Sequence, residues 1–271
     1  MAKRRSGVSR VVAAVVILAL LLTGWFGGRA AWRHFTASAA HGCTFGTSTL
    51  TTDQASVAST MVGVVLRRSL PQRAAVLTLA AGLQESKLTN LPLGAGDRDS
   101  VGVLQQRPSQ GWGTEQQLSD VHYATGKFLD ALVKVHGWQQ LPLADAIQEV
   151  QRSADGTAYA KHEYDATAVA AGFWGRPRGV ACRFAKPDEV APAATVAAHL
   201  RRDLPVREPM VSGRNIRVPG AGWPTVAWLV ANGDRLGLES VTYAGWQWTR
   251  HGKWQEVRSV DRDVHATVAK T

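Results

Sequence analysis

The strongest candidate for acid-base chemistry is a glutamate in the segment Gln84-Glu85-Ser86. Glu85 lies near the end of a predicted apolar helix, and the polar segment Asp99 to Gln106 begins about fifteen residues later. A glutamate that is partly removed from water has a raised pKa, so it keeps its proton near neutral pH and is able to act as a general acid. Glu85 meets this description of a general acid, and protonation of a glycosidic oxygen is one reaction that needs such a group. A solvated helix glutamate without a chemical role is the alternative.

A second carboxylate would decide how such a cleavage proceeds. Retaining and inverting hydrolases place it at about 5 Å and about 6.5 to 9.5 Å from the acid, respectively. Asp97 and Asp99 are the candidates for a second carboxylate. Aspartates in Gly-rich turns usually bond their own backbone, so a purely structural role is the alternative for both.

Several motifs follow Glu85 in a recognisable order. They are Glu85-Ser86, Ser100, Gly102-Val103-Leu104-Gln105 and a predicted helix over Val121 to Leu132. These motifs resemble the catalytic Glu-Ser element, the Gly-Leu-Met-Gln element and the Asn-Ile-x-x-Gly-x-x-Tyr-Leu helix of the superfamily of soluble lytic transglycosylases and goose-type lysozymes. His122 and Phe128 depart from that pattern, and Glu149 to Ser153 stands where the family has Ala-Tyr-Asn-x-Gly.

The segment from Asp97 to Gly113 is also similar to lysozyme-like domains in exported proteins of high-GC Gram-positive bacteria. The resemblance covers about residues 52–174. It implies a lysozyme-like fold that binds the glycan strands of peptidoglycan in a cleft, with Glu85 as the proton donor. In the transglycosylases of this superfamily one glutamate suffices, because the 6-hydroxyl of the substrate closes a 1,6-anhydro ring while the glutamate changes from acid to base.

The resemblance also indicates which side chains contact the sugar. We expect hydrogen bonds to N-acetyl groups and hydroxyls from one set of polar residues and a far cleft wall from another. The expected substrate-binding residues are Ser100, Gln105 and Gln106 for the first set and Tyr123, Gln151 and Tyr159 for the second. No cofactor and no metal are expected, because the sequence contains no Cys-x-x-Cys and no His-Glu-x-x-His motif.

The elements that must position these residues are mostly helical. Apolar residues at helical spacing predict helices from Asp53, from Pro71, after Asp120, behind Pro142 and over 159–173. Residues 89–113 are rich in turn formers and predict a small hairpin. The predicted fold class is therefore mainly α with a small β insertion, lysozyme-like, after one N-terminal transmembrane helix and before a small C-terminal α+β domain. The predicted boundaries are 53–187 for the lysozyme-like domain, 188–210 for a linker helix and 211–271 for a Trp-rich α+β domain.

The N-terminal segment is predicted to anchor the chain. Residues 11–28 are eighteen residues without a charged side chain, and at about 1.5 Å per residue such a helix just spans a hydrocarbon core of ~30 Å. Four cations precede this segment and only Arg29 and Arg33 closely follow it, which leaves residues 1–10 as a cytoplasmic basic tail. Residues 29–52 are predicted to form a stalk. The alternative is a signal peptide cleaved near Ala37-Ser38-Ala39.

Export affects how the two cysteines are interpreted. Thiols outside the cytoplasm tend to oxidise, so we predict a disulfide between Cys43 and Cys182. Two unpaired buried thiols are the alternative. The predicted location is the cell membrane, with a single pass and extracytoplasmic C-terminal domains.

Composition narrows the function classes. The 271 residues are 45% hydrophobic and include ten Trp, which excludes wholesale disorder, and the net charge of +10 favours a polyanionic neighbour. A nucleic-acid partner is not expected, because the chain has no basic recognition element and is predicted to be exported. The sequence therefore favours a membrane-anchored enzyme that cleaves peptidoglycan. A catalytically inactive lysozyme-like protein that binds the wall or scaffolds an envelope or conjugation assembly is the alternative, and the C-terminal domain is a candidate for docking an envelope protein.

Overall fold

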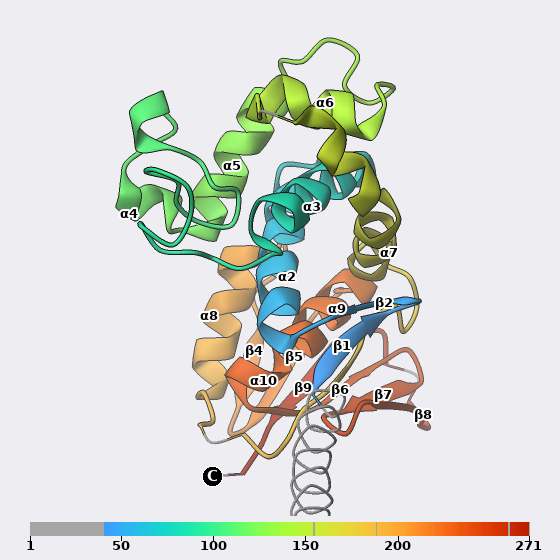
Figure 1. The fold of residues 1–271 in the computed structure, drawn as a ribbon. Helices are drawn as coiled ribbons and strands as arrows, with labels where there is room; N and C mark the ends of the chain where they lie inside the picture. Colours follow the sequence, from blue (N-terminus) through green and yellow to red (C-terminus); the bar gives the residue numbers. More distant parts are fainter. Residues whose placement is uncertain (1–40, 154, 188, 260, 271) are drawn as a thin grey trace, which may run out of the picture. The chain divides into compact units, whose positions relative to one another are not determined.

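The computed structural model describes residues 41–153, 155–187, 189–259 and 261–270. Residues Gly42–Thr271 form one compact unit, which mixes helices with antiparallel sheets (Figure 1). The predicted cytoplasmic tail and transmembrane segment, residues 1–10 and 11–28, lie outside the described residues. Within the described ranges no helix is both long enough and apolar enough to cross a membrane.

The helices begin where local side chains satisfy the free backbone N–H groups. At the first helix, Thr51 Oγ1 accepts from Gln54 N at 3.2 Å while Gln54 Oε1 accepts from Thr51 N at 2.9 Å, which forms a capping box. The next helix, Gln72–Ser86, is rich in Ala and Leu. It is buried over most of its length against the helices Thr52–Arg67 and Glu163–Phe173. The helices are α2 (Thr52–Arg67), α3 (Gln72–Ser86), α4 (Glu115–Leu118), α5 (Val121–Leu132), α6 (Leu143–Gln151), α7 (Glu163–Phe173), α8 (Ala193–Asp203), α9 (Trp223–Ala231) and α10 (Gly233–Leu236), with short 3-10 helices η1 (Pro108–Gln110) and η2 (Gly156–His162).

The strands form two antiparallel sheets. The smaller sheet has the order β2-β1-β3, and the larger has the order β4-β5-β9-β6-β7-β8. The strands are β1 (Gly42–Phe45), β2 (Ser48–Leu50), β3 (Ala181–Arg183), β4 (Met210–Ser212), β5 (Asn215–Val218), β6 (Leu238–Tyr243), β7 (Trp246–Thr249), β8 (Lys253–Glu256) and β9 (Val264–Val268).

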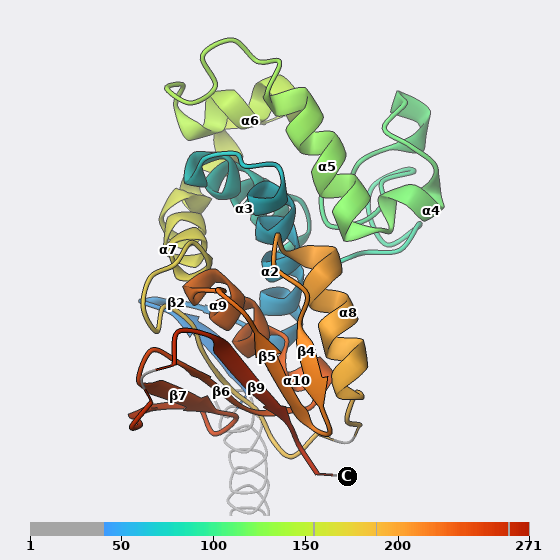
Figure 2. The same ribbon diagram turned by 180° about the vertical axis from the view of Figure 1, so that it is seen from behind.

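The two ends of the unit differ in secondary structure. Helices α5 and α6 lie at one end, and the six-stranded sheet lies at the other, as both views show (Figures 1 and 2). Helix α9 packs on β6 and also contacts α2 and α7, so it joins the sheet to the helices. The buried side chains of Trp228 on α9 and Trp248 on β7 contribute to this shared core.

The predicted fold class is wrong. The chain is not a mainly α fold with one small β insertion, because it contains antiparallel sheets of six and three strands. Residues 89–113 do not form the predicted hairpin of regular strands; only the isolated bridges Leu91–Gly102 and Val101–Gln106 form there. The physical reason is that the strands are short, three to six residues, and several pair across long sequence distances, as β5 does with β9. Alternation of apolar and polar residues within a short stretch of sequence does not indicate which distant strand that stretch will pair with.

Candidate active site

Glu85 lies in the last turn of α3, where that helix leaves the core. Most of the preceding residues, Ala74 to Gly82, are buried, whereas Glu85 is half-buried. The helix ends because Lys87 adopts a left-handed conformation, with φ of 56°. Next to Glu85, the hydroxyl of Ser86 donates to the carbonyl of Val103 at 2.8 Å. The end of α3 is therefore held against the segment 101–106.

Two side chains from a distant part of the chain contact the carboxyl group of Glu85. The hydroxyl of Tyr159 donates to Glu85 Oε1 at 2.5 Å. The side chain of Gln151 also hydrogen-bonds this carboxyl group, and Gln151 Nε2 donates to the carbonyl of Leu104 at 2.9 Å. Gln151 ends α6 and Tyr159 lies in η2, so three segments meet at Glu85: the end of α3, residues 101–106 and residues 151–159.

The surroundings of Glu85 favour its protonated form. Burial raises the pKa of Glu85, and the hydrogen bonds from Tyr159 and Gln151 oppose that effect without cancelling it. Burial and the neighbouring carboxyl group also raise the pKa of Tyr159 above its ordinary value, so this phenol remains a neutral donor. Glu85 thus combines a raised pKa with two donors that can stabilise its carboxylate after proton loss. That combination suits a group that first gives and then takes a proton.

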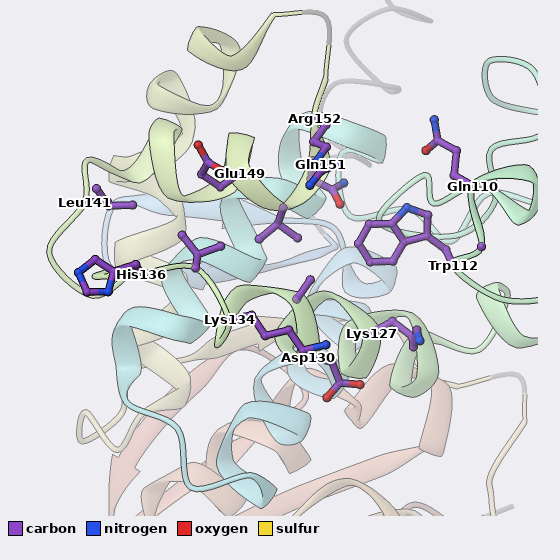
Figure 3. A pocket seen from close by; sticks show the side chains of 14 residues that line it. Gln110, Trp112, Lys127, Asp130, Lys134, His136, Leu141, Glu149, Gln151 and Arg152 are labelled. Carbon is purple, nitrogen blue, oxygen red and sulfur yellow. The ribbon is translucent and has the colours of Figure 1, made fainter.

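A cleft of about 1040 Å³ opens between α5, α6 and the segment around Trp112 (Figure 3). Gln151 lines it near Trp112, and His136 and Leu141 lie at its other end. Glu85 itself is not among the residues that line the cleft, and the cleft-lining Gln151 connects the Glu85 carboxyl group to the cleft through their hydrogen bond. A cleft of this size is large enough for several sugar units or a comparable ligand.

The walls of the cleft carry cations that the sequence analysis did not single out. Lys127 and Lys134 come from the α5 side and Arg152 from the end of α6. Among the described residues none of these three has an acidic partner, whereas the nearby Asp130 pairs with Arg68 at 2.6 Å. The spacing of Lys127, Asp130 and Lys134 by three and four positions was a usable signal, since it places them on one helical face.

In the described part of the chain, three predicted sugar-binding residues form no hydrogen bond with Glu85. Gln105 has φ of 46°, and its Nε2 donates back to the carbonyl of Gly102 at 2.9 Å. Gln106 is buried and donates to the carbonyl of Ala124 at 3.2 Å, while its Oε1 has no partner. Ser100 is buried in the same segment. These side chains shape the 100–106 segment, and their predicted sugar contacts stay predictions.

Tyr123 is placed differently from the residues around Glu85. It lies in the first turn of α5, and its hydroxyl donates to the carbonyl of Trp112 at 3.3 Å. Trp112 in turn lines the cleft. Tyr123 therefore supports a cleft wall, and it is Tyr159 and Gln151 that the structure brings to the candidate acid.

Neither candidate for a second carboxylate joins the hydrogen bonds around Glu85. Asp99 accepts from Arg107 Nε at 2.6 Å and from the backbone N of Ser109 at 2.8 Å, and these bonds hold the pKa of Asp99 well below its usual range. Asp97 is exposed and lies beside Arg98. Within the described residues no group of three or more His, Cys, Asp or Glu side chains is arranged to hold a metal ion.

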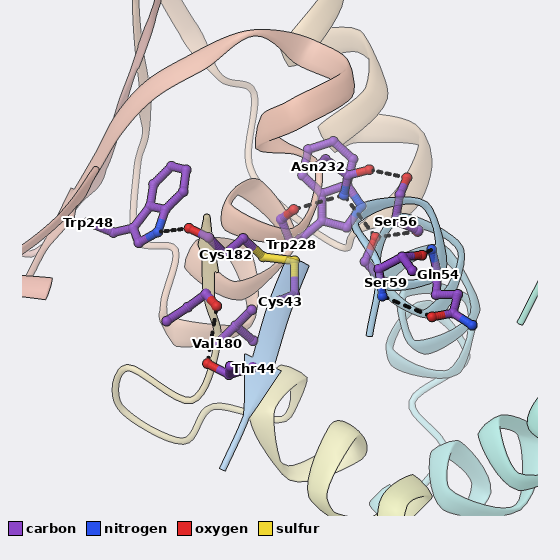
Figure 4. Close-up of a disulfide and its surroundings, with 12 residues drawn as sticks. Cys43, Thr44, Gln54, Ser56, Ser59, Val180, Cys182, Trp228, Asn232 and Trp248 are labelled. Carbon is purple, nitrogen blue, oxygen red and sulfur yellow. Dashed lines mark hydrogen bonds between the residues drawn. A yellow bond between two sulfur atoms is a disulfide. The ribbon is translucent and has the colours of Figure 1, made fainter. Parts of the chain in front are cut away.

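The predicted disulfide is confirmed. Cys43 on β1 and Cys182 on β3 lie opposite each other in the sheet and are bonded, and both are buried (Figure 4). The carbonyl of Cys182 accepts from Trp248 Nε1 at 3.0 Å, which links the small sheet to the large one. The bond encloses the segment that contains every candidate site residue.

Comparison with known proteins adds no relatives. No protein-family model matches the sequence, and no curated protein matches it.

Proposed function

We propose that the protein is a membrane-anchored enzyme that cleaves the glycan strands of peptidoglycan outside the cytoplasm, with Glu85 as the general acid and base. The observation that carries this proposal is the surroundings of Glu85, which has a raised pKa and two neutral hydrogen-bond donors, one of which, Gln151, lines a cleft of about 1040 Å³. The motif resemblance around Glu85, Ser86 and Gly102 to Gln105 supports the same chemistry. Anchoring rests on the apolar segment 11–28.

The proposed reaction begins with proton transfer. Protonated Glu85 gives its proton to the glycosidic oxygen. The bond between that oxygen and the anomeric carbon breaks as positive charge develops on the sugar ring. The resulting carboxylate is stabilised by hydrogen bonds from Tyr159 and Gln151. Glu85 then accepts the proton of the substrate's 6-hydroxyl while that oxygen closes a 1,6-anhydro ring.

A route with one glutamate fits the surroundings better than a route with two carboxylates. Both oxygens of Asp99 are already engaged by Arg107 and Ser109, and Asp97 is exposed to solvent. The groups bonded to Glu85 are a phenol and an amide. We therefore favour an anhydro product over a reducing end.

A wall-binding protein without catalysis is the second candidate. It is favoured by the positions of Gln105 and Gln106, which bond carbonyl groups of Gly102 and Ala124. The cations Lys127, Lys134 and Arg152 would then attract the carboxylates of the wall without any chemistry at Glu85. In either case we propose the C-terminal part as the surface that docks an envelope protein.

The test is mass spectrometry of purified peptidoglycan after digestion with the full chain in detergent. Glu85→Gln should lower product formation by about 10² to 10⁴-fold, because general acid-base catalysis contributes that much. The matched control is Glu256→Gln, which removes an exposed carboxylate from β8 and should leave the rate unchanged. Circular dichroism would establish that both variants are folded.

The products distinguish the possibilities. Anhydromuropeptides that depend on Glu85 identify a lytic transglycosylase, and reducing ends that depend on Glu85 identify a hydrolase. Binding to sedimented wall without any product would instead support the non-catalytic candidate.

A further inference from the structure

The point where the folded unit begins lies beside a turn of the large sheet. Gly42, the first residue of the unit, pairs with Arg183 in the β1–β3 register. Arg183 in turn forms an isolated bridge with His251 in the β7–β8 turn, and Phe184 N donates to the carbonyl of Arg250 at 3.0 Å. Three segments, residues 42, 183–184 and 250–252, therefore lie side by side.

This region carries exposed cations without acidic partners. Arg183, Lys186 and Lys253 are exposed, and within the described part of the chain none of them forms an ion pair. We call these three residues the basic edge. The neighbouring Arg250 differs, since its Nε lies 3.5 Å from a carboxylate oxygen of Glu239. The basic edge is thus a surface with net positive charge next to the start of the folded unit.

We propose that the basic edge binds the anionic headgroups of the phospholipid bilayer in which the chain is anchored. This inference rests on the membrane attachment proposed above and goes beyond it. Only residues 29–41, thirteen residues, separate the predicted transmembrane segment from Gly42. A chain of thirteen residues spans at most about 45 Å, so attachment at residue 28 keeps the edge near the headgroups and at high effective concentration.

Charge complementarity selects anionic lipid as the partner. Each Lys or Arg near an anionic leaflet strengthens binding by about five-fold, and this attraction is lost within a screening length of about 8 Å at physiological salt. Attachment of the chain at a single point does not by itself fix the orientation of the folded unit above the bilayer. Contact through the three cations holds one orientation.

That orientation has a consequence for the cleft. The cleft-forming helices α5 and α6 lie at the end of the unit opposite the sheet that carries the β7–β8 turn (Figures 1 and 2). A unit that rests on its basic edge presents the cleft away from the bilayer. The enzyme would then face the wall and not the lipid.

The test uses the full chain in nanodiscs of phosphatidylcholine alone or mixed with phosphatidylglycerol. Hydrogen exchange is followed by mass spectrometry in peptides that cover residues 181–187 and 249–254. We expect exchange there to slow by about five-fold or more in the anionic discs, and high salt to abolish the difference. Arg183→Glu/Lys253→Glu should also abolish it.

A matched variant separates a local contact from a general charge effect. Arg207→Glu/Lys161→Glu changes the net charge equally at exposed residues outside the basic edge and should retain the protection. Equal exchange in the two kinds of disc, or protection that survives Arg183→Glu/Lys253→Glu, would overturn the inference. Failure of the wild-type chain to enter either disc would overturn membrane attachment together with it. The peptidoglycan digestion reports on catalysis independently of either result.

Discussion

Glu85 and Asp203 are both carboxyl groups removed from water, yet their pKa values move in opposite directions. Burial raises the pKa of Glu85 above the ordinary value, and its two neutral donors do not reverse this effect. Burial also acts on Asp203, which is 1% exposed, but there the hydrogen bonds from His122 and Trp228 and the nearby positive charges lower the pKa overall. The nature and number of the donors, more than depth of burial, decide which form is favoured.

The two carboxyl groups serve different parts of the molecule. Asp203 ends α8 and accepts from His122 Nε2 at 2.8 Å, from Trp228 Nε1 at 2.9 Å and from Thr60 Oγ1 at 3.3 Å, so it joins four helices. The donors to Glu85 are the neutral side chains of Tyr159 and Gln151, and Gln151 lines the cleft. A buried carboxylate whose desolvation is offset by hydrogen bonds and positive charges stabilises the fold. A carboxyl group whose desolvation is only partly offset keeps a raised pKa and is able to transfer a proton.

The largest effect should follow from Asp203→Ala, which leaves the bonded groups of His122 and Trp228 without their acceptor. We expect the free energy of unfolding to fall by about 3 to 5 kcal/mol at neutral pH, measured by urea denaturation. Because the folded pKa of Asp203 is lowered, its contribution is present above the unfolded pKa of about 3.9 and is lost as the pH falls through the folded value. The difference between variant and wild type should therefore shrink in acid.

Glu208→Ala is the matched control for this prediction. Glu208 is exposed and pairs with Arg201, and such surface pairs contribute less than about 1 kcal/mol. If Asp203→Ala cost no more than this control, the proposed distinction between the two carboxyl groups would be wrong.

The next effect concerns Tyr159→Phe, which removes one donor from Glu85 and keeps the buried ring. The pKa of Glu85 should rise further, because the Tyr159 hydrogen bond lowers it. General acid catalysis requires the protonated form, so the descending limb of the pH–rate profile should move to higher pH. The maximal rate should drop by about ten-fold, since the carboxylate formed after proton transfer loses a stabilising bond.

Tyr164→Phe provides the comparison for Tyr159→Phe. Tyr164 is 68% exposed and bonds Thr47 outside the cleft, so its pH–rate profile should match that of the wild type. An unshifted profile in Tyr159→Phe would show that this phenol does not tune Glu85.

The smallest effect should be a gain in stability from Glu85→Gln. The folded pKa of Glu85 is raised, so the wild type is penalised once the pH rises above the unfolded pKa of about 4.3, and the penalty is complete above the folded value. Glutamine does not ionise. Thermal and urea denaturation at pH 8 should show the variant more stable by on the order of 1 kcal/mol, with no difference near pH 3.5. A less stable variant at pH 8 would contradict the raised pKa.

Some of these features were predictable from the sequence and others were not. The Cys43–Cys182 pairing was predicted because the chain contains two cysteines and is expected to be exported, and the pairing is confirmed. Glu85 was identifiable by its helix and by the following Gly-Val-Leu-Gln segment, although its role stays a prediction. Nothing in the sequence around Asp203 indicated its structural role. That role depends on contacts with His122 and Thr60, which lie 81 and 143 positions away in the sequence.

The same limit applies to the contacts within the candidate site. Gln105 was predicted to hydrogen-bond the sugar and Tyr159 to form part of the far cleft wall; in the structure Gln105 has a positive φ and its amide donates to the carbonyl of Gly102. Tyr159 bonds Glu85 across 74 positions of sequence, in a region where the family pattern is lost. Local sequence patterns indicate which residue types are present and which helix or strand they belong to. They do not indicate the backbone dihedral angles of a turn or which distant side chain will contact a given residue after folding.

The position of the disulfide determines how tension would pass through the molecule. Cys43 follows Gly42 directly and is covalently joined to Cys182 on β3. If residues 11–28 anchor the chain as proposed, a pull between that anchor and the C-terminal sheet would run from residue 43 to residue 182 and on into the sheet. The 139 positions between the cysteines, worth about 480 Å of extended chain at about 3.5 Å per residue, would bear no load. The cleft and Glu85 therefore lie in a covalent loop that such a pull would bypass.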